Sequence, residues 1–177
     1  MADSSETTTG IASDAAVPAN AGSGGTLPRF VAGSDHAGVH LKDALVAHLR
    51  TAGYEVLDLG THGDASVDYP DYGAAVAHAV LDGRGSLGLA VCGTGIGIAM
   101  AATRAGARAA TVHDVTSARL ARQHNDANVI CLGERLTGPQ AAIDALMMFA
   151  TTPFEGGRHA RRLALIEAIS PNTVPSA

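Results

Sequence analysis

A cysteine stands where a run of apolar residues gives way to closely spaced glycines. Residues 87–92 form a short, continuous apolar run, which is typical of a strand buried on both faces, and the Ala/Ile/Met-rich segment after residue 97 indicates a helix. Glycines at 93, 95 and 97 let a ligand approach the backbone. The free amides of a helix's first turn favour negative charge, so they would stabilise a Cys92 thiolate. Cys92 is therefore a candidate nucleophile or general base; the open alternative is a small buried residue that ends a strand.

Other chemically capable side chains follow strands of the same pattern. Asp35 and His36 come after the apolar residues 30–33, and Arg135 follows the last apolar run. Asp68 and Tyr69 close the loop that follows the second run. In open parallel sheets ligands bind outside the carboxyl ends of the strands, so these side chains are predicted to gather near Cys92.

His124 and Asn125 occupy a different position in the pattern. They come just before the last predicted strand, and so at the opposite edge of the sheet from Cys92. If His124 is catalytic, this placement predicts that it serves a neighbouring subunit. The alternative is a histidine at a helix C-terminus that interacts with the last carbonyls.

Two arginines near the end of the chain could bind a phosphate. Arg158 and Arg162 are spaced i, i+4 at the start of the last predicted helix and share one face. They form a candidate phosphate clamp, with a solvated basic face as the alternative.

His36 and His40 have the same spacing, but no third ligand accompanies them, so no metal site is predicted. The glycines do not form G-x-G-x-x-G, because Ile98 stands at the third glycine position.

Alternation of strands and helices predicts the fold class. Strands are expected at residues 30–33, 54–59, 87–92, 108–112 and 128–132. Helices are expected at about residues 41–52, from 69, after 97, and at 116–123, 139–150 and 158–169. Short loops between alternating elements predict an α/β domain with a parallel sheet covered on both faces.

Composition limits the classes of partner. The chain has 177 residues, of which 46% are hydrophobic and 16% charged, and this suits one domain, placed at residues 29–170 with tails at 1–28 and 171–177. We expect the N-terminal tail to be disordered and without a secretory signal. A net charge of −5 and the absence of Trp argue against nucleic acid, and no apolar run approaches the ~20 residues of a membrane span. Cys92 and Cys131 make no disulfide framework, which predicts a cytoplasmic protein, with Cys131 in the core.

Five motifs follow one another along the chain: Gly33-Ser34-Asp35-His36-Ala37-Gly38, Asp68-Tyr69-Pro70, Cys92-Gly93-Thr94-Gly95-Ile96-Gly97, Arg122-Gln123-His124-Asn125-Asp126 and Glu155-Gly156-Gly157-Arg158-His159. Together, in this order, they resemble the family of type B ribose-5-phosphate isomerases, which also holds the galactose-6-phosphate isomerase subunits. The resemblance covers about residues 30–169. One branch of that family has a Glu base in the glycine loop; Ile96 stands there in this chain, so the resemblance is to the cysteine branch.

The resemblance implies a three-layer α/β/α Rossmann-like domain with a five-stranded parallel sheet. It implies a homodimer or dimer of dimers with active sites shared across the interface and no metal or organic cofactor. The implied reaction interconverts ribose 5-phosphate and ribulose 5-phosphate through an enediolate, in the pentose phosphate pathway. Tetrose or hexose phosphates stay open as substrates, because the motifs do not report sugar length. The alternative from another class is a non-catalytic Rossmann-like nucleotide-binding module.

The roles of single residues are also implied by the resemblance. Cys92 would move the proton between C1 and C2, Thr94 and the loop amides would hold the oxyanion, and Asp35 and His124 would open the sugar ring. His124, Asn125 and Arg135 would come from the partner subunit. The substrate would be lined by His36, Asp68, Tyr69, Gly93, Gly95, Ile96, Gly97 and Asn125, and its phosphate bound by Arg135, Arg158 and Arg162.

Overall fold

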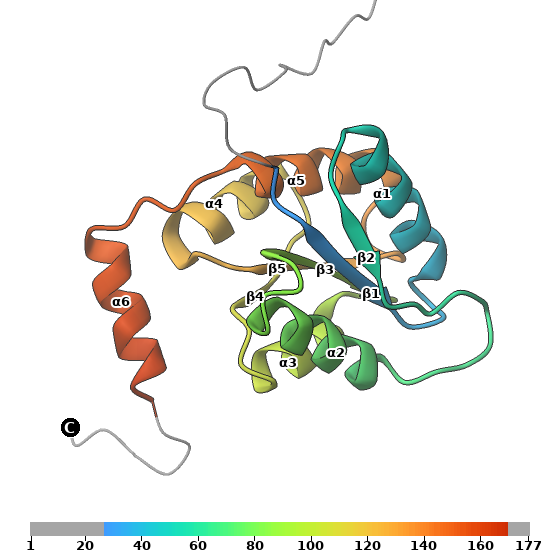
Figure 1. Ribbon diagram of the computed structural model, residues 1–177, viewed down its shortest axis with the longest axis horizontal. Coiled ribbons are helices and arrows are strands. Elements are labelled where there is room, and N and C mark those ends of the chain that lie inside the picture. The colour runs from blue at the N-terminus through green and yellow to red at the C-terminus, as the bar shows by residue number, and fades with distance from the viewer. Residues whose placement is uncertain (1–26, 170–177) are drawn as a thin grey trace, which may run out of the picture.

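Five parallel strands form the middle layer of the computed structural model, which describes residues 27–169 (Figure 1). Their order in the sheet is β2-β1-β3-β5-β4, and every neighbouring pair is parallel. The predicted α/β class and five-stranded parallel sheet are confirmed. Of the expected tails at 1–28 and 171–177, residues 1–26 and 171–177 lie outside the described residues. The strands are β1 (Phe30–Ser34), β2 (Val56–Asp58), β3 (Leu87–Cys92), β4 (Ala109–Thr111) and β5 (Val129–Gly133).

The three central strands are buried along their whole length, which explains their continuous apolar sequences. The edge strands β2 and β4 are only half-buried and three residues long. The prediction of a buried strand over 54–59 is therefore wrong, and so is the five-residue length expected for 108–112. An edge strand is hydrogen-bonded to a neighbour on one side only, so fewer of its residues pair with the sheet and its unpaired side faces solvent.

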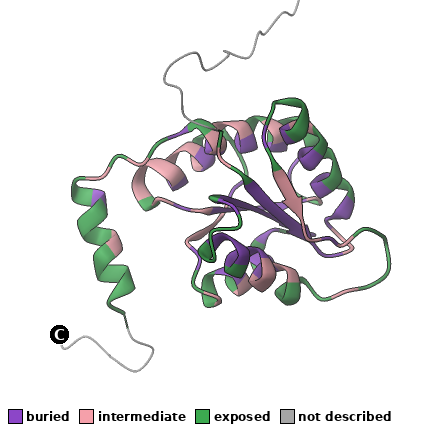
Figure 2. Ribbon diagram, viewed as in Figure 1, coloured by how far each residue is buried: buried purple, intermediate pink, exposed green. Residues whose placement is uncertain are grey.

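Helices cover both faces of the sheet (Figure 1). One face packs against α1 (Val39–Thr51), α4 (Val115–Asn125) and α5 (Pro139–Thr151), and the other against α2 (Tyr69–Leu81) and α3 (Ile96–Arg104). The last helix, α6 (Arg158–Glu167), stands away from these layers and is exposed over most of its length (Figure 2). Among residues 27–169, none of these helices has the length and apolar character needed to cross a membrane.

Both ends of α4 are fixed by side chains, which sets the position of His124 in its last turn. At the N-terminus, the Ser117 amide donates to Asp114 Oδ1 at 2.7 Å in a capping box. At the C-terminus, Asp126 adopts a left-handed φ of 41°, and its carboxylate pairs with Arg108 at 2.7 Å and Arg122 at 2.9 Å. These contacts offset the strain of a left-handed non-glycine residue.

A buried lysine joins α1 to the end of β2. Lys42 is fully buried, and its Nζ lies 2.9 Å from Asp58 Oδ2 and 2.7 Å from Asp43 Oδ1. The Gly60 amide donates to the same Asp58 carboxylate at 2.9 Å. Lys42 thereby fixes the start of the loop that leads from β2 to Asp68.

We expect Lys42→Met to lower the free energy of unfolding by about 3 kcal/mol, because it leaves the mostly buried Asp58 carboxylate without its cation. Urea denaturation of the variant would measure this loss. Arg29→Met is the matched control: the Arg29–Glu55 pair is exposed, at 3.8 Å, and its removal should cost less than about 1 kcal/mol. Equal losses in the two variants would contradict a structural role for the buried pair.

Candidate active site

Cys92 ends β3 and lies against the turn that begins α3. Its side chain is buried, and Sγ accepts a hydrogen bond from the Gly95 amide at 3.1 Å. Gly95 has a left-handed φ of 77°, and a Cβ there would come within 2.9 Å of the Leu132 carbonyl carbon. Only glycine can make this turn, and the turn brings a helix N-terminus to the sulfur. The amide donor and the helix N-terminus both direct positive partial charge at Sγ, so the geometry suits Cys92 as a base.

The same loop offers donors to a developing negative charge. The Thr94 side chain is exposed, and its Oγ1 accepts from the Ile96 amide at 3.3 Å. The amides of Gly97 and Ile98 belong to the first turn of α3, where the helix provides no carbonyl for them. Tyr69 lies against this turn, because a Cβ at Gly97 would come within 2.7 Å of its ring.

The loop after β1 lies beside the end of β3. The Asp35 amide donates to the Val91 carbonyl at 3.3 Å, and Asp35 Oδ1 accepts from the Ala37 amide at 3.0 Å. Burial raises the pKa of the Asp35 carboxyl above its ordinary value, against the opposing effect of its hydrogen bonds and of nearby positive charge. His36 Nδ1 lies 3.2 Å from both the amide nitrogen and the carbonyl oxygen of Val67, next to the exposed Asp68.

Arg135 belongs to the site of its own chain. Its amide donates to the Gly93 carbonyl at 3.0 Å, and its guanidinium covers Gly93, where a Cβ would lie 3.3 Å from Cζ. The expectation that Arg135 is supplied by the partner subunit is therefore wrong. The position of Arg135 directly after the last strand predicts the observed placement correctly, because β5 lies next to β3 in the sheet and both strands end at the same edge. We call Asp35, His36, Tyr69, Arg135 and residues 92–97 the Cys92 cluster.

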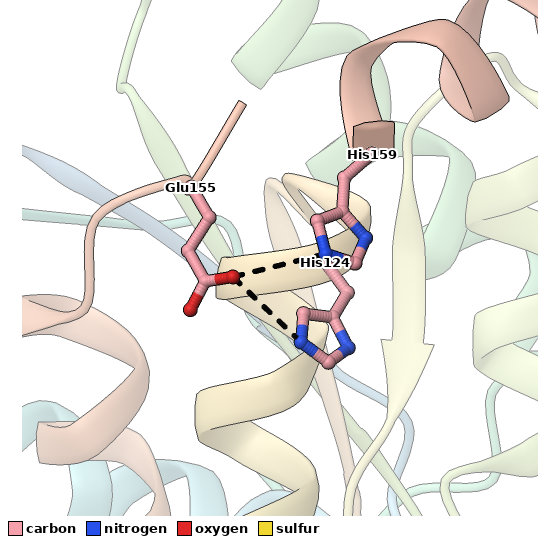
Figure 3. Close-up of side chains that lie close together, drawn as sticks. All are labelled: His124, Glu155 and His159. Carbon is pink, nitrogen blue, oxygen red and sulfur yellow. Dashed lines mark ion pairs between the residues drawn. The ribbon is translucent and has the colours of Figure 1, made fainter. Parts of the chain in front are cut away.

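His124 lies in a second group, at the other edge of the sheet. Its ring stacks on that of His159, with centroids 4.2 Å apart and an angle of 5° between the planes. Glu155 Oε2 lies 3.9 Å from His124 Nε2 and 3.7 Å from His159 Nε2 (Figure 3). Arg158 Nε donates to His159 Nε2 at 3.3 Å. These four residues form the His124 cluster; Asn125 and Arg162 are exposed beside it.

His159 is a buried residue whose importance the sequence did not show. Burial lowers the pKa of its imidazole, and the neighbouring His124 and Arg158 lower it further. The sequence offers no identifiable partner for His159, and Glu155 stands out in it only as part of a motif. Their i, i+4 spacing was visible, but nothing in the sequence connected them with His124, 31 residues before Glu155.

The His124 cluster has the composition of a metal site without its geometry. One ligand atom from each of His124, Glu155 and His159 lies within 4.8 Å of the others. An imidazole binds a metal along the lone pair in its ring plane, and two parallel stacked rings cannot direct both lone pairs at one ion. In addition, Arg158 donates into the His159 nitrogen that a metal would need. The cluster would have to rearrange before it could hold a cation.

One chain keeps the two clusters apart. Cys92 lies at the carboxyl end of β3, whereas His124 precedes β5, and α6 stands on the side of the molecule away from the arrowheads of β1 and β2 (Figure 1). The predicted placement of His124 at the opposite edge of the sheet is confirmed. Arg158 and Arg162, on α6, are likewise separated from Arg135.

Residues 30–166 match the model of the family described as Ribose/Galactose Isomerase. The chain belongs to this family. It is 42% identical over 144 residues to the ribose-5-phosphate isomerase B of Escherichia coli K12, covering 81% of this chain and 97% of that protein. It is 45% identical over 143 residues to a probable ribose-5-phosphate isomerase B of Mycoplasma pneumoniae, covering 80% and 93%.

Solved structures of this family share the fold. The ribose-5-phosphate isomerase B of Clostridium thermocellum matches with a TM-score of 0.77 and 47% identity, over 78% of this chain and 94% of that one. That of Mycoplasma genitalium, solved with bound ribulose-5-phosphate, matches with a TM-score of 0.74 and 42% identity, over 78% and 93%. The resemblance inferred from the motifs and the three-layer Rossmann-like fold are both confirmed.

Asp35→Asn is expected to raise the melting temperature at neutral pH, because the raised pKa of Asp35 means that the fold disfavours its charged form. The gain in melting temperature should be complete at pH values above the pKa of Asp35 in the folded protein. It should shrink as the pH falls through that pKa toward the ordinary value of 3.8, because Asp35 then becomes neutral, as the asparagine is at every pH. Thermal unfolding across this range measures it. Asp144→Asn, which removes an exposed carboxylate on α5, is the control and should change nothing. A melting temperature that is lower at every pH would show that the carboxylate stabilises the fold.

Proposed function

We propose that this protein interconverts ribose 5-phosphate and ribulose 5-phosphate, with Cys92 as the base, in active sites that a second copy of the chain completes. The observation that carries the proposal is the Cys92 sulfur at the N-terminus of α3, hydrogen-bonded by the Gly95 amide. The names of its relatives and the ribulose-5-phosphate bound to the M. genitalium protein support the choice of substrate. This reaction would place the protein in the pentose phosphate pathway and in the cytoplasm.

The reaction needs a base that moves one carbon-bound proton. The Cys92 thiolate takes the proton from C2 of the open aldose, the C2–H electron pair forms the C1=C2 double bond of the enediolate, and the electrons of the C1 carbonyl move to its oxygen. The thiol then returns the proton to C1 while the hydroxyl proton of O2 passes to O1, which leaves the C2 carbonyl of the ketose. Negative charge that develops on oxygen faces Thr94 and the first-turn amides of α3. Cys131 cannot take this role, because it is fully buried in β5 and burial raises the pKa of its thiol.

A second copy of the chain is needed because the His124 cluster lies apart from Cys92. Large apolar side chains on two helices are left exposed: Ile96 and Met100 on α3, and Leu165 and Ile166 on α6, with exposed fractions from 53% to 69%. In a two-fold pair, α6 of one subunit could cover α3 of the other, and the reverse contact would follow by symmetry. That arrangement would carry His124, Asn125, Arg158 and Arg162 to the partner's Cys92 cluster, where Arg135 would share the phosphate.

Cys92→Ser tests the role of the base. Serine keeps the shape of the side chain but is largely protonated near neutral pH, so kcat should fall by ~10²–10⁴-fold while KM changes little. Turnover of ribose 5-phosphate, and exchange of the C1 hydrogen of ribulose 5-phosphate with deuterated water, would both measure it. Near-normal turnover would overturn Cys92 as the base. If the wild-type protein turned over a four- or six-carbon aldose phosphate faster than ribose 5-phosphate, the proposed substrate would be wrong.

Mixing two inactive variants tests the shared site. Cys92→Ala and His124→Ala each inactivate both sites of a dimer that carries the substitution in both subunits. A mixed dimer of the two variants holds one intact site, so it should recover up to half of the wild-type activity per dimer. Subunit exchange verified by mass spectrometry, followed by an activity assay, measures the recovery. Verified mixed dimers without activity would mean that each site is built from one chain.

A further inference from the structure

The carboxylate of Glu155 faces the two stacked histidines from a loop that is fixed in place by its backbone. The Glu155 amide donates to the carbonyl of Gln123 at 3.0 Å, which ties the loop to the residue before His124. Gly156 and Gly157 then turn the chain into α6 with left-handed φ values of 65° and 56°. The side chain of Glu155 can therefore be changed without removing the contact that holds its loop.

Glu155 is the acidic group among the charges that face the stacked rings. From α6, Arg158 and Arg162 act on His159 and lower its pKa, as His124 does from α4, whereas Glu155 raises it. At the end of α4, Arg122 and Asp126 pair with each other at 2.9 Å. Without Glu155, the two imidazoles would face mainly positive charge, and the pKa of His159 would lose the contribution that raises it.

The Glu155 carboxylate also distinguishes the two nitrogens of His124. Oε2 faces Nε2, and Nδ1 points away from the carboxylate (Figure 3). A carboxylate near one ring nitrogen favours the tautomer with its proton there, and the other nitrogen is then free to accept a proton. The stacked His159 ring restricts rotation of the His124 ring.

We propose that Glu155 is a positioning residue that holds His124 in the tautomer and orientation needed to open the sugar ring. This inference rests on the proposed function. In ring opening, the proton of the anomeric hydroxyl goes to His124 Nδ1, and the O–H electron pair becomes the C1=O double bond. The bond from C1 to the ring oxygen breaks, and that oxygen takes a proton from an acid on the other side of the ring, a role that suits Asp35 because burial raises the pKa of its carboxyl.

Glu155→Gln separates ring opening from proton transfer at carbon. Ribose 5-phosphate is a ring and must be opened, whereas ribulose 5-phosphate cannot close a five-membered ring through its phosphorylated O5. Conversion of ribose 5-phosphate should therefore fall on the order of 10- to 100-fold in kcat with KM little changed, less than the full loss of an acid–base group. Exchange of the C1 hydrogen of ribulose 5-phosphate in deuterated water should stay at the wild-type rate.

Two further variants complete the test. Glu155→Asp keeps the charge on a shorter side chain and should recover part of the lost turnover, and Asp144→Asn removes a distant exposed carboxylate and should behave as wild type.

Wild-type turnover of ribose 5-phosphate in Glu155→Gln, or an equal loss of turnover and C1 exchange, would overturn the positioning role. A wild-type protein that does not convert ribose 5-phosphate at all would instead refute the proposed function, and the inference with it. Circular dichroism spectra and melting curves would confirm that each variant is folded.

Discussion

The pairing of β3 with β5 is the constraint on which the Cys92 cluster depends. Cys92 pairs with Gly133 in the register of the two strands, and the backbone of Thr94 passes so close to Gly133 that a side chain there would collide with it. The turn at Gly95 then rests on the backbone at the end of β5. This close approach keeps the Gly95 amide on the sulfur and Arg135 over the loop, so a displaced β5 would dismantle both.

A parallel sheet has two functional edges, and one chain cannot bring them together. Each strand delivers its following loop to the carboxyl edge, where the Cys92 cluster forms, and each helix returns the chain to the opposite edge, where His124 ends α4. The chain then leaves the layers with α6, which contacts the rest of the domain mainly through α4. Within one chain the fold therefore keeps the Cys92 cluster and the His124 cluster at opposite edges of the sheet.

Buried and half-buried charged groups at both edges of the sheet have compensating contacts. Lys42 has two carboxylates, and Asp126 in its left-handed conformation has two arginines. Asp35 is less completely compensated, since the pKa of its carboxyl remains raised. A buried carboxyl that resists ionisation costs stability but can hold a proton for acid catalysis, which is the kind of compromise expected at an active site.

The sequence by itself determined the α/β class, the strand that ends at Cys92, the glycine turn after it and the opposite placement of His124. These features follow from local pattern: apolar runs, helical periodicity and alternation of elements fix which edge each loop reaches. Only the tertiary structure decided that Arg135 joins the Cys92 cluster of its own chain, and that Glu155 and His159 surround His124. Those contacts join residues brought together by strand order and by the departure of α6 from the layers, and neither is encoded in the spacing of residues along the chain.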